Sequence, residues 1–226
     1  MGRKTLVRAQ VTGLAAAALT LLACGPDGRG EVRVSVLGTR GGSYLDPSGV
    51  DLGSNIFVSQ ALVRLGRVTV SSDTQELARE TPLYVNLFEE VLVLQGDMAS
   101  SAIREVAVEV PAPQGDGVLP GEPVSIFVTG SIEGIWFEYR DVDTPPISVE
   151  TEEELNEGTT LEMQLQFDLK DWFDGIEAAG LTEGTKPSGD PCFFIDASRN
   201  SGAQMQIEQS MRDSLSLEAE EIDVED

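Results

Sequence analysis

Hydrophobic and polar residues alternate along most of the chain, which is the pattern of β-strands with one buried face. The clearest run extends from Leu161 to Leu169, where apolar residues occupy the odd positions and glutamate, glutamine or aspartate the even ones. Shorter runs of the same kind recur between Val32 and Tyr139, separated by segments rich in turn-forming residues. The sequence therefore predicts a mainly β fold, an antiparallel β-sandwich.

One of these runs changes phase along its length. Its apolar residues occupy odd positions up to Leu65 and even positions from Val68, with Gly66 between them. An extra residue in one strand shifts the alternation in this way, so we expect a β-bulge around Gly66.

Two segments nearer the C-terminus carry a helical period. Asp171 is placed to cap a short helix that ends at Gly180 and docks on the sandwich through an apolar stripe containing Trp172. A second helix starts near Asn200 and repeats apolar residues at steps of four as far as Leu215. This spacing predicts a C-terminal amphipathic helix.

The first 22 residues differ from the rest of the chain. Three basic residues, Arg3, Lys4 and Arg8, precede an uncharged, mostly apolar segment at 11–22. A basic region followed by a short apolar region is typical of an export signal, and the apolar segment is too short to span a bilayer. The sequence therefore predicts an exported protein.

The apolar segment ends in Leu21-Leu22-Ala23-Cys24. This motif resembles the lipobox of bacterial lipoproteins, where signal peptidase II cleaves before a lipid-modified cysteine. The resemblance implies cleavage between Ala23 and Cys24 and covalent attachment of lipid to Cys24, which would anchor the chain to a membrane. The expected location is the bacterial cell envelope; inner or outer membrane, and a periplasmic or surface-exposed position, stay open.

These patterns divide the chain into four parts. Residues 1–23 form the signal peptide, and residues 24–30 the lipidated cysteine with a flexible tether. Residues 31–199 form the β-sandwich domain, and residues 200–226 a C-terminal helix with an acidic tail. Because the tail at 218–226 is dominated by acidic residues, we expect it to be disordered.

Four segments of the sandwich region give a second, broader resemblance. They are Arg67–Val70, Val85–Leu87, Val91–Gly96 and Ile103–Val108. In this order they resemble the uncharacterised β-sandwich domains of bacterial surface lipoproteins. The resemblance supports the fold and implies no particular activity.

Acidic residues outnumber basic ones 39 to 15, and the net charge is −24. Without residues 1–23 the chain would keep 12 basic and 39 acidic residues, a net charge of −27. Such a charge repels phosphates, so nucleic acid is excluded as a partner, whereas divalent cations and basic partners are attracted. Asp141 and Asp143 are spaced as in a calcium loop, but the glycine and the final glutamate of an EF-hand are absent, so no motif supports calcium.

The chain contains no histidine. This excludes Ser-His-Asp and Cys-His nucleophilic schemes and zinc sites with histidine ligands. If lipid occupies Cys24, the second cysteine, Cys192, is left without a partner; it lies between Pro191 and two phenylalanines, which favours a buried apolar position over a reactive thiol. No catalytic motif is present, so we do not expect an enzyme.

Trp136 is the best candidate for a ligand contact. If Ile135, Phe137 and Tyr139 face the core, alternation places Trp136, Glu138 and Arg140 together on the opposite face. A tryptophan there could stack on a sugar or on a partner side chain. The alternative is that a helix or loop, such as the one carrying Trp172, covers it.

These observations predict a membrane-anchored exported lipoprotein whose β-sandwich has a non-catalytic role in binding or envelope interaction. Its partner, protein or glycan, stays open. One alternative is a carbohydrate- or calcium-binding module that uses the loops at 39–55 or 111–121, or Trp136. The other is a carboxylate-dependent hydrolase, which requires a cleft and a carboxyl group of raised pKa.

Overall fold

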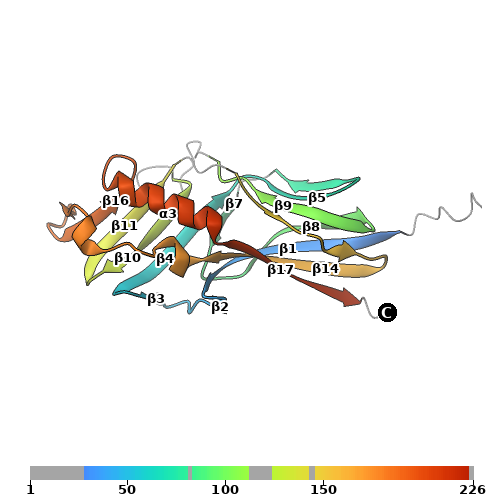
Figure 1. The fold of residues 1–226 in the computed structure, drawn as a ribbon, viewed down its shortest axis with the longest axis horizontal. Helices are drawn as coiled ribbons and strands as arrows, with labels where there is room; N and C mark the ends of the chain where they lie inside the picture. The colour runs from blue at the N-terminus through green and yellow to red at the C-terminus, as the bar shows by residue number, and fades with distance from the viewer. Residues whose placement is uncertain (1–27, 81–82, 112–123, 143–145, 224–226) are drawn as a thin grey trace, which may run out of the picture.

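The computed structural model describes residues 28–80, 83–111, 124–142 and 146–223. Within these ranges the protein is mainly β, with several sheets and two α-helices, and the predicted β-sandwich-like fold is confirmed (Figure 1). The molecule is elongated, with the two helices towards one end and the start of the first strand at the other.

Sheet A is organised around β1 (Arg29–Arg40). This strand lies between β14, which is parallel to it, and β8, which is antiparallel, and β17 pairs with the outer side of β14. Val32, Val34 and Val36 are completely buried on the inner face, as their alternation predicts. The other strands of the sheet are β2 (Ser43–Tyr44), β8 (Val91–Ala99), β14 (Thr159–Asp168) and β17 (Leu215–Asp223).

Sheet B has the order β15-β16-β11-β10-β4-β3, with β7 also paired to β4. Its strands are β3 (Val50–Gly53), β4 (Ile56–Leu65), β7 (Leu83–Asn86), β10 (Ile126–Ile132), β11 (Ile135–Asp141), β15 (Gly184–Thr185) and β16 (Pro191–Ile195). Sheet C has the order β12-β9-β5-β6, with β13 also paired to β9. Its strands are β5 (Val68–Ser72), β6 (Glu76–Arg79), β9 (Ser101–Val108), β12 (Ile147–Glu150) and β13 (Glu154–Leu155).

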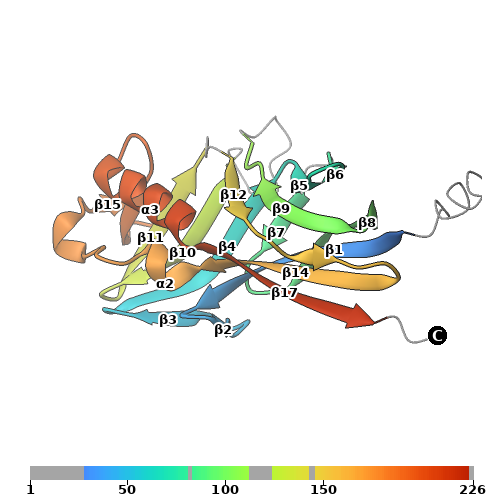
Figure 2. The same ribbon diagram turned by 45° about the vertical axis from the view of Figure 1, so that its right-hand side comes forward.

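Sheets B and C together form one layer of the sandwich. The chain passes directly from β4 in sheet B to β5 in sheet C, and the N–H of Gly66 at this junction donates to the carbonyl of Glu109 at 2.8 Å. The second layer consists of sheet A over sheet C and of the two helices over sheet B (Figures 1 and 2). One continuous hydrophobic core lies between the layers.

The phase change at Gly66 has a different origin from the predicted bulge. It marks the passage between two sheets, where β4 ends at Leu65 and β5 begins at Val68. Both residues are buried, so the chain must rotate between them to keep an apolar residue inward on each side of the junction.

The first helix is shorter than predicted. α2 spans only Leu169–Trp172, and Asp168 rather than Asp171 caps it, because the Asp168 carboxylate accepts from the N–H of Lys170 at 2.9 Å. Gly175 adopts a positive φ of 73°, which ends the helical path, and a 3₁₀ turn follows at Ala178–Gly180. The predicted docking is confirmed: Trp172 is completely buried.

The second helix, α3 (Ser201–Asp213), is confirmed as an amphipathic helix whose Ile207 and Met211 are completely buried. It stops before Leu215, which was expected to continue its stripe but begins β17. Figures 1 and 2 show α3 lying across the strands of sheet B.

The prediction of a disordered acidic tail is wrong as far as Asp223. Residues 215–223 form β17, which pairs with β14 along its whole length. Leu215, Leu217 and Ala219 alternate with polar residues and pack against the core, and this local alternation outweighs the acidic composition of the segment. Residues 224–226 lie outside the described part of the chain.

The sandwich is also not purely antiparallel. β1 pairs with β14 and β11 pairs with β16 in parallel. Parallel neighbours need long crossover connections, and here the chain between β1 and β14 builds most of sheets B and C. The pattern of alternation predicts buried faces but does not specify which strands become neighbours.

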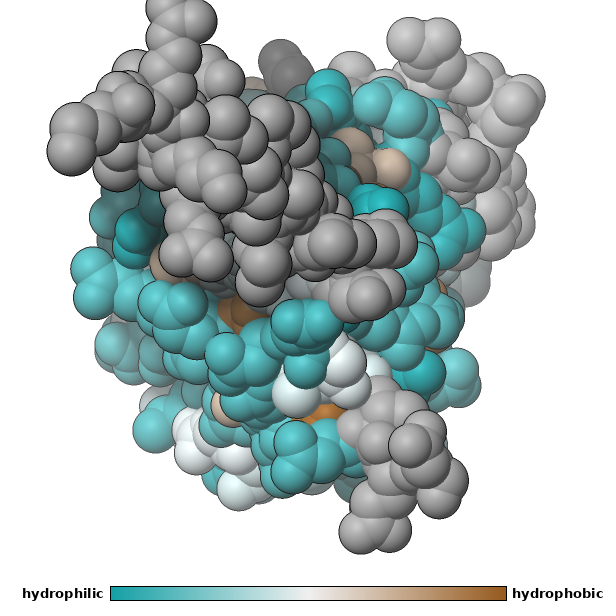
Figure 3. Space-filling model, turned by 90° about the vertical axis from the view of Figure 1, so that its right-hand side faces the viewer, coloured by the Kyte–Doolittle hydropathy of each residue, from teal (hydrophilic) through white to brown (hydrophobic). Residues whose placement is uncertain are grey.

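Figure 3 views the end of the molecule at which β1 begins and β17 finishes. The described residues on this end are predominantly hydrophilic, with few hydrophobic side chains exposed between them. The end that a tether would join is therefore a polar surface.

Candidate functional site

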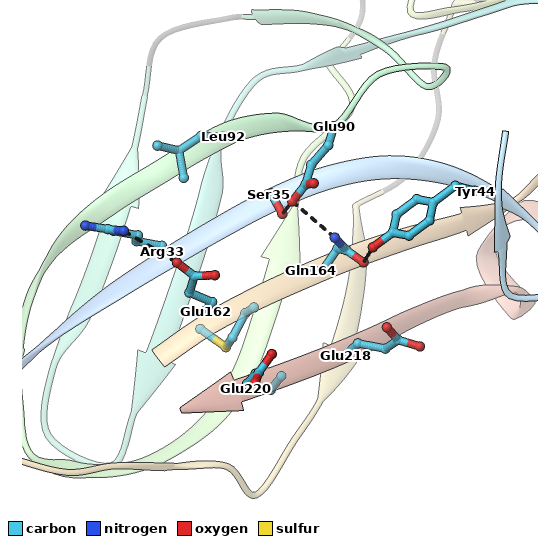
Figure 4. Close-up of a pocket in the computed structure, with 11 residues that line it drawn as sticks. Arg33, Ser35, Tyr44, Glu90, Leu92, Glu162, Gln164, Glu218 and Glu220 are labelled. Atoms are coloured by element: carbon cyan, nitrogen blue, oxygen red, sulfur yellow. Dashed lines mark hydrogen bonds and ion pairs between the residues drawn. The ribbon is translucent and has the colours of Figure 1, made fainter. Parts of the chain in front are cut away.

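A groove of about 660 Å³ lies on the outer face of sheet A (Figure 4). Neighbouring strands supply its walls: β8, β1, β14 and β17, with β2 at one end. The residues of this sheet A groove are Arg33, Ser35, Tyr44, Glu90, Leu92, Glu162, Met163, Gln164, Glu218, Ala219 and Glu220.

Register explains why these side chains converge. Arg33 of β1 lies opposite Glu162 of β14, and Ser35 lies opposite Gln164. On the other side of β14, Glu162 faces Glu220 of β17, and Gln164 faces Glu218. Because these residues share one parity on adjacent strands, they all point to the same face of the sheet.

A chain of hydrogen bonds organises one side of the groove. The Glu90 carboxylate accepts from the hydroxyl of Ser35 at 2.8 Å and from the side-chain amide of Gln164 at 3.1 Å. The carbonyl oxygen of Gln164 accepts from the Tyr44 hydroxyl at 3.4 Å and from the amide of Gln166 at 3.0 Å. Gln164 is thereby held between Glu90 and Tyr44, as Figure 4 shows.

The opposite side of the groove carries unbalanced negative charge. Glu162 has one cationic neighbour, Arg33, at 3.4 Å, and Arg33 also pairs with Glu31 at 2.8 Å. Within the described ranges, Glu218 and Glu220 form neither an ion pair nor a hydrogen bond through their carboxylates, although Glu220 lies directly opposite Glu162. Like charges at such a position repel each other and destabilise the strand pair.

Two exposed hydrophobic residues border the groove. Tyr44 of β2 is 69% exposed and Leu92 of β8 is 49% exposed. Tyr44 belongs to the loop region at 39–55 that the sequence singled out for a binding module. The groove therefore combines free carboxylates with apolar surface that a bound molecule could cover.

Local hydrogen bonding lowers the pKa of a carboxyl beside the groove. The amide of Gln95 donates to Glu31 and is the main cause of the lowered pKa of that carboxyl; Arg33 adds to it, and partial desolvation opposes it. Directly after β16, desolvation by partial burial acts to raise the pKa of Asp196, but the hydrogen bonds from Ser198 and Arg199 together outweigh it and lower the pKa. Both groups are thus held as carboxylates.

Trp136, Glu138 and Arg140 lie together on the outer face of sheet B, as predicted. The neighbouring Phe137 and Tyr139 are completely buried on the inner face. The Nε of Arg140 donates to the Glu138 carboxylate at 2.7 Å, which shows that the two side chains share a face.

Trp136 is not free for stacking, however. The ammonium group of Lys186 lies 3.9 Å from the centre of its ring, in the turn after β15. This is a cation–π contact, and it occupies one face of the indole. A turn therefore covers Trp136 in part, whereas Trp172 packs in the core against Phe167.

Two other aromatic residues of this face are matched in the same way. The guanidinium of Arg199 lies 4.1 Å from the centre of the Phe194 ring, and that of Arg140 lies 5.9 Å from the centre of Phe127. All the cation–π pairs found in the described ranges involve residues of sheet B or its adjoining turns. Phe57 of β4 shares this face and stays 40% exposed, so the face pairs most of its aromatic rings with cations but not all of them.

Cys192 lies on this same face, beside Trp136 in the register of β16 and β11. It is completely buried, and burial is the main cause of the raised pKa of its thiol. A protonated, inaccessible thiol is a poor nucleophile, which agrees with the apolar role expected for it.

The segment with calcium-like spacing, for which the sequence gives no supporting motif, is described only as far as Val142. Asp141 is buried, and its carboxylate accepts from the N–H of Val142 at 2.8 Å, while Asp143 lies outside the described residues. Within the part of the chain that the structure describes, no cluster of three or more acidic or cysteine side chains is arranged to hold a metal ion.

Ala23 and Cys24 also lie outside the described residues, so cleavage and lipidation stay predictions. Among residues 28–223, apart from the gaps, no helix combines the length and the apolar character needed to cross a bilayer.

Sequence reasoning missed the sheet A groove, although it identified the polar face of β14 that forms its floor. The alternation of Glu162, Gln164 and Gln166 is visible in the sequence. The missing information was the pairing of that face with β1 on one side and β17 on the other, because β17 was expected to be disordered.

Comparisons of the chain with protein-family models, with curated proteins and with solved structures give no match.

Proposed function

We propose that this is an exported, lipid-anchored protein that binds a basic segment of a partner protein in the sheet A groove, without catalysis. The observation that carries the proposal is the pair Glu218 and Glu220, whose carboxylates have no cationic partner among the described residues although they line the sheet A groove. A basic ligand would neutralise them and relieve the repulsion between Glu220 and Glu162.

The border of the groove supports a peptide rather than a free cation. Tyr44 and Leu92 expose apolar surface across the groove from the carboxylates of β17. A lysine- or arginine-rich segment carries long methylene stems as well as charge, so it can cover both kinds of surface at once. A metal ion would use the carboxylates alone.

The position of the groove supports a role near a membrane. Arg33 and Ser35 lie four and six residues beyond the start of β1, so the groove begins about 13 to 20 Å from the point where a tether would enter. A partner bound there would be held close to the anchored end of the molecule.

Binding is favoured over hydrolysis by the openness of the groove. Its walls are exposed, as the 69% exposure of Tyr44 indicates, so water is not excluded from the carboxylates.

A glycan is the second candidate, because Tyr44 presents an exposed ring beside a hydrogen-bonded glutamine. Aromatic rings and amides are common sugar contacts. This candidate predicts binding of neutral oligosaccharides that is lost in Tyr44→Ala and does not change with salt, whereas binding of a basic segment weakens as salt rises.

Calorimetry of the full chain in detergent would test the basic-segment proposal. The probe is a synthetic ten-residue peptide of alternating lysine and threonine with blocked ends. The double variant Glu218→Gln/Glu220→Gln should bind it about fivefold more weakly, because two exposed charge interactions are lost. The matched control is Glu152→Gln/Glu153→Gln, which removes the same charge from an exposed loop. Equal weakening in both double variants would mean that net charge alone attracts the peptide.

The anchor needs its own test. Expression of the full chain in a bacterial host fed labelled palmitate should give a labelled, membrane-bound product. Cys24→Ala should abolish the label. Labelling that survives this substitution would overturn the assignment of Cys24.

A further inference from the structure

β17 is paired on one side only. It forms hydrogen bonds with β14 from the pair Phe167–Leu215 to the pair Thr159–Asp223, without a register shift. In the described ranges no strand pairs with its other side; β12 of sheet C approaches it from the opposite layer but is paired with β9. Both ribbon views show β17 at the rim of the molecule (Figures 1 and 2).

A strand in this position presents unused hydrogen-bonding groups. In an antiparallel pair, the N–H and C=O of every second residue point away from the partner strand. Along β17 these groups face outward, as at any open sheet edge, and can accept a further strand.

Acidic side chains are the only feature in the sequence of β17 that opposes pairing of its open edge with another strand. β17 contains no proline and no basic residue, and its acidic residues are Glu218, Glu220, Glu221 and Asp223. Pairing of two such edges from two copies would set carboxylate against carboxylate. The edge therefore rejects a second copy of this chain but not a strand of opposite charge.

The sheet A groove lies directly beside this edge. Glu218 and Glu220 project from β17 onto the outer face, where they line the groove, while Leu217 and Ala219 pack inward. A strand added along β17 would place every second side chain on the same outer face, next to these two carboxylates.

We infer that the basic segment binds by adding to sheet A as a further strand along β17, with alternate lysines or arginines beside Glu218 and Glu220. This inference rests on the proposed function and specifies its mode. The backbone hydrogen bonds supply affinity, and the acidic outer face selects a partner with basic residues at every second position. The nine residues of β17 give room for a segment about 30 Å long.

Residue-resolved amide hydrogen exchange of the full chain in detergent tests this mode. The probe is the same lysine–threonine peptide, and a glutamate–threonine peptide is the charge control. At saturation, every second amide of β17 should exchange with solvent at least about tenfold more slowly than in the free protein. These amides become hydrogen-bond donors to the added strand. The control peptide should neither bind nor protect.

The outcomes separate the two proposals. Binding with no new protection on β17 would overturn strand addition and leave a charged groove that holds the peptide through side chains alone. Absence of binding would overturn both. The double variant Glu218→Gln/Glu220→Gln, at a peptide concentration that restores saturation, should show the same alternating protection, because its backbone edge is unchanged.

Discussion

The outer faces of sheets A and B both carry many polar side chains, yet they differ in how their charged groups are paired. On sheet B, Lys186 covers Trp136, and Arg140 pairs with Glu138. On sheet A, Glu218 and Glu220 have no cationic neighbour in the described ranges. A conspicuous side chain such as Trp136 is therefore a weaker indication of a binding site than groups left without partners.

The largest expected effect comes from a substitution in the hydrophobic core, at Trp172. Trp172 is buried in the core and meets Phe167 edge to face at 5.8 Å, so Trp172→Ala should lower the free energy of unfolding by about 3–5 kcal/mol. Urea denaturation of the wild type and the variant measures this difference in the free energy of unfolding. Trp172→Phe is the control and should lose less; a loss below about 1 kcal/mol for alanine would mean that the helix carrying Trp172 is not needed for the fold.

A smaller effect distinguishes structure from binding on sheet B. Trp136→Ala removes a half-buried ring and its contact with Lys186, and should lower the free energy of unfolding by about 1–2 kcal/mol. The affinity for the basic peptide should not change. Calorimetry measures the peptide affinity, and urea denaturation of the same sample measures the free energy of unfolding. Weaker peptide binding with unchanged stability would mean that Trp136 contacts the ligand after all.

Charge reversal should have opposite effects on the two faces. Glu220→Lys replaces a repulsion with Glu162 by an attraction and should raise the free energy of unfolding by about 0.5–1 kcal/mol. Glu138→Lys places two cations together and should lower it by a similar amount. Thermal denaturation at low salt compares them, and 1 M salt should reduce both effects. The same sign in both variants would contradict the difference between the faces.

The smallest expected effect concerns pH. The pKa of Glu31 is lowered from its ordinary value of 4.5, chiefly by the hydrogen bond from Gln95. A lowered folded-state pKa stabilises the protein above pH 4.5, and this contribution is lost as pH falls through the folded-state value. Thermal denaturation between pH 5.5 and 3.5 should therefore show a smaller loss of stability in Glu31→Gln than in the wild type. Gln95→Ala should reproduce the smaller loss; an unchanged slope in both variants would refute the assignment.

The sequence was sufficient to predict buried faces, because alternation is a local property. Val32, Val34 and Val36 were correctly identified in this way, and so was the strand expected at 161–169, which the structure places at Thr159–Asp168, with Leu169 beginning α2. Pairing is not local. The parallel partnership of β1 with β14 leaves no mark in either segment, since each would look the same beside any other strand.

The candidate site could be predicted only in part, for the same reason. The shared face of Trp136, Glu138 and Arg140 follows from spacing within one strand, but the turn carrying Lys186 that covers the indole belongs to a distant segment. The acidic composition of residues 218–226 concealed the short apolar alternation of Leu215, Leu217 and Ala219, which is what makes β17 a strand. The overall composition of a segment does not record the order of its residues, and here the order of apolar and polar residues determines the strand.

The central position of β1 has a consequence for the order in which the chain folds. Arg33 and its partner Glu162 are 129 residues apart, so sheet A cannot close until nearly the whole chain is available. Contacts of such separation require a large loop to close first and slow the rate of folding. Among the strands that the structure describes, β1 leaves the ribosome first, yet it is among the last to be enclosed.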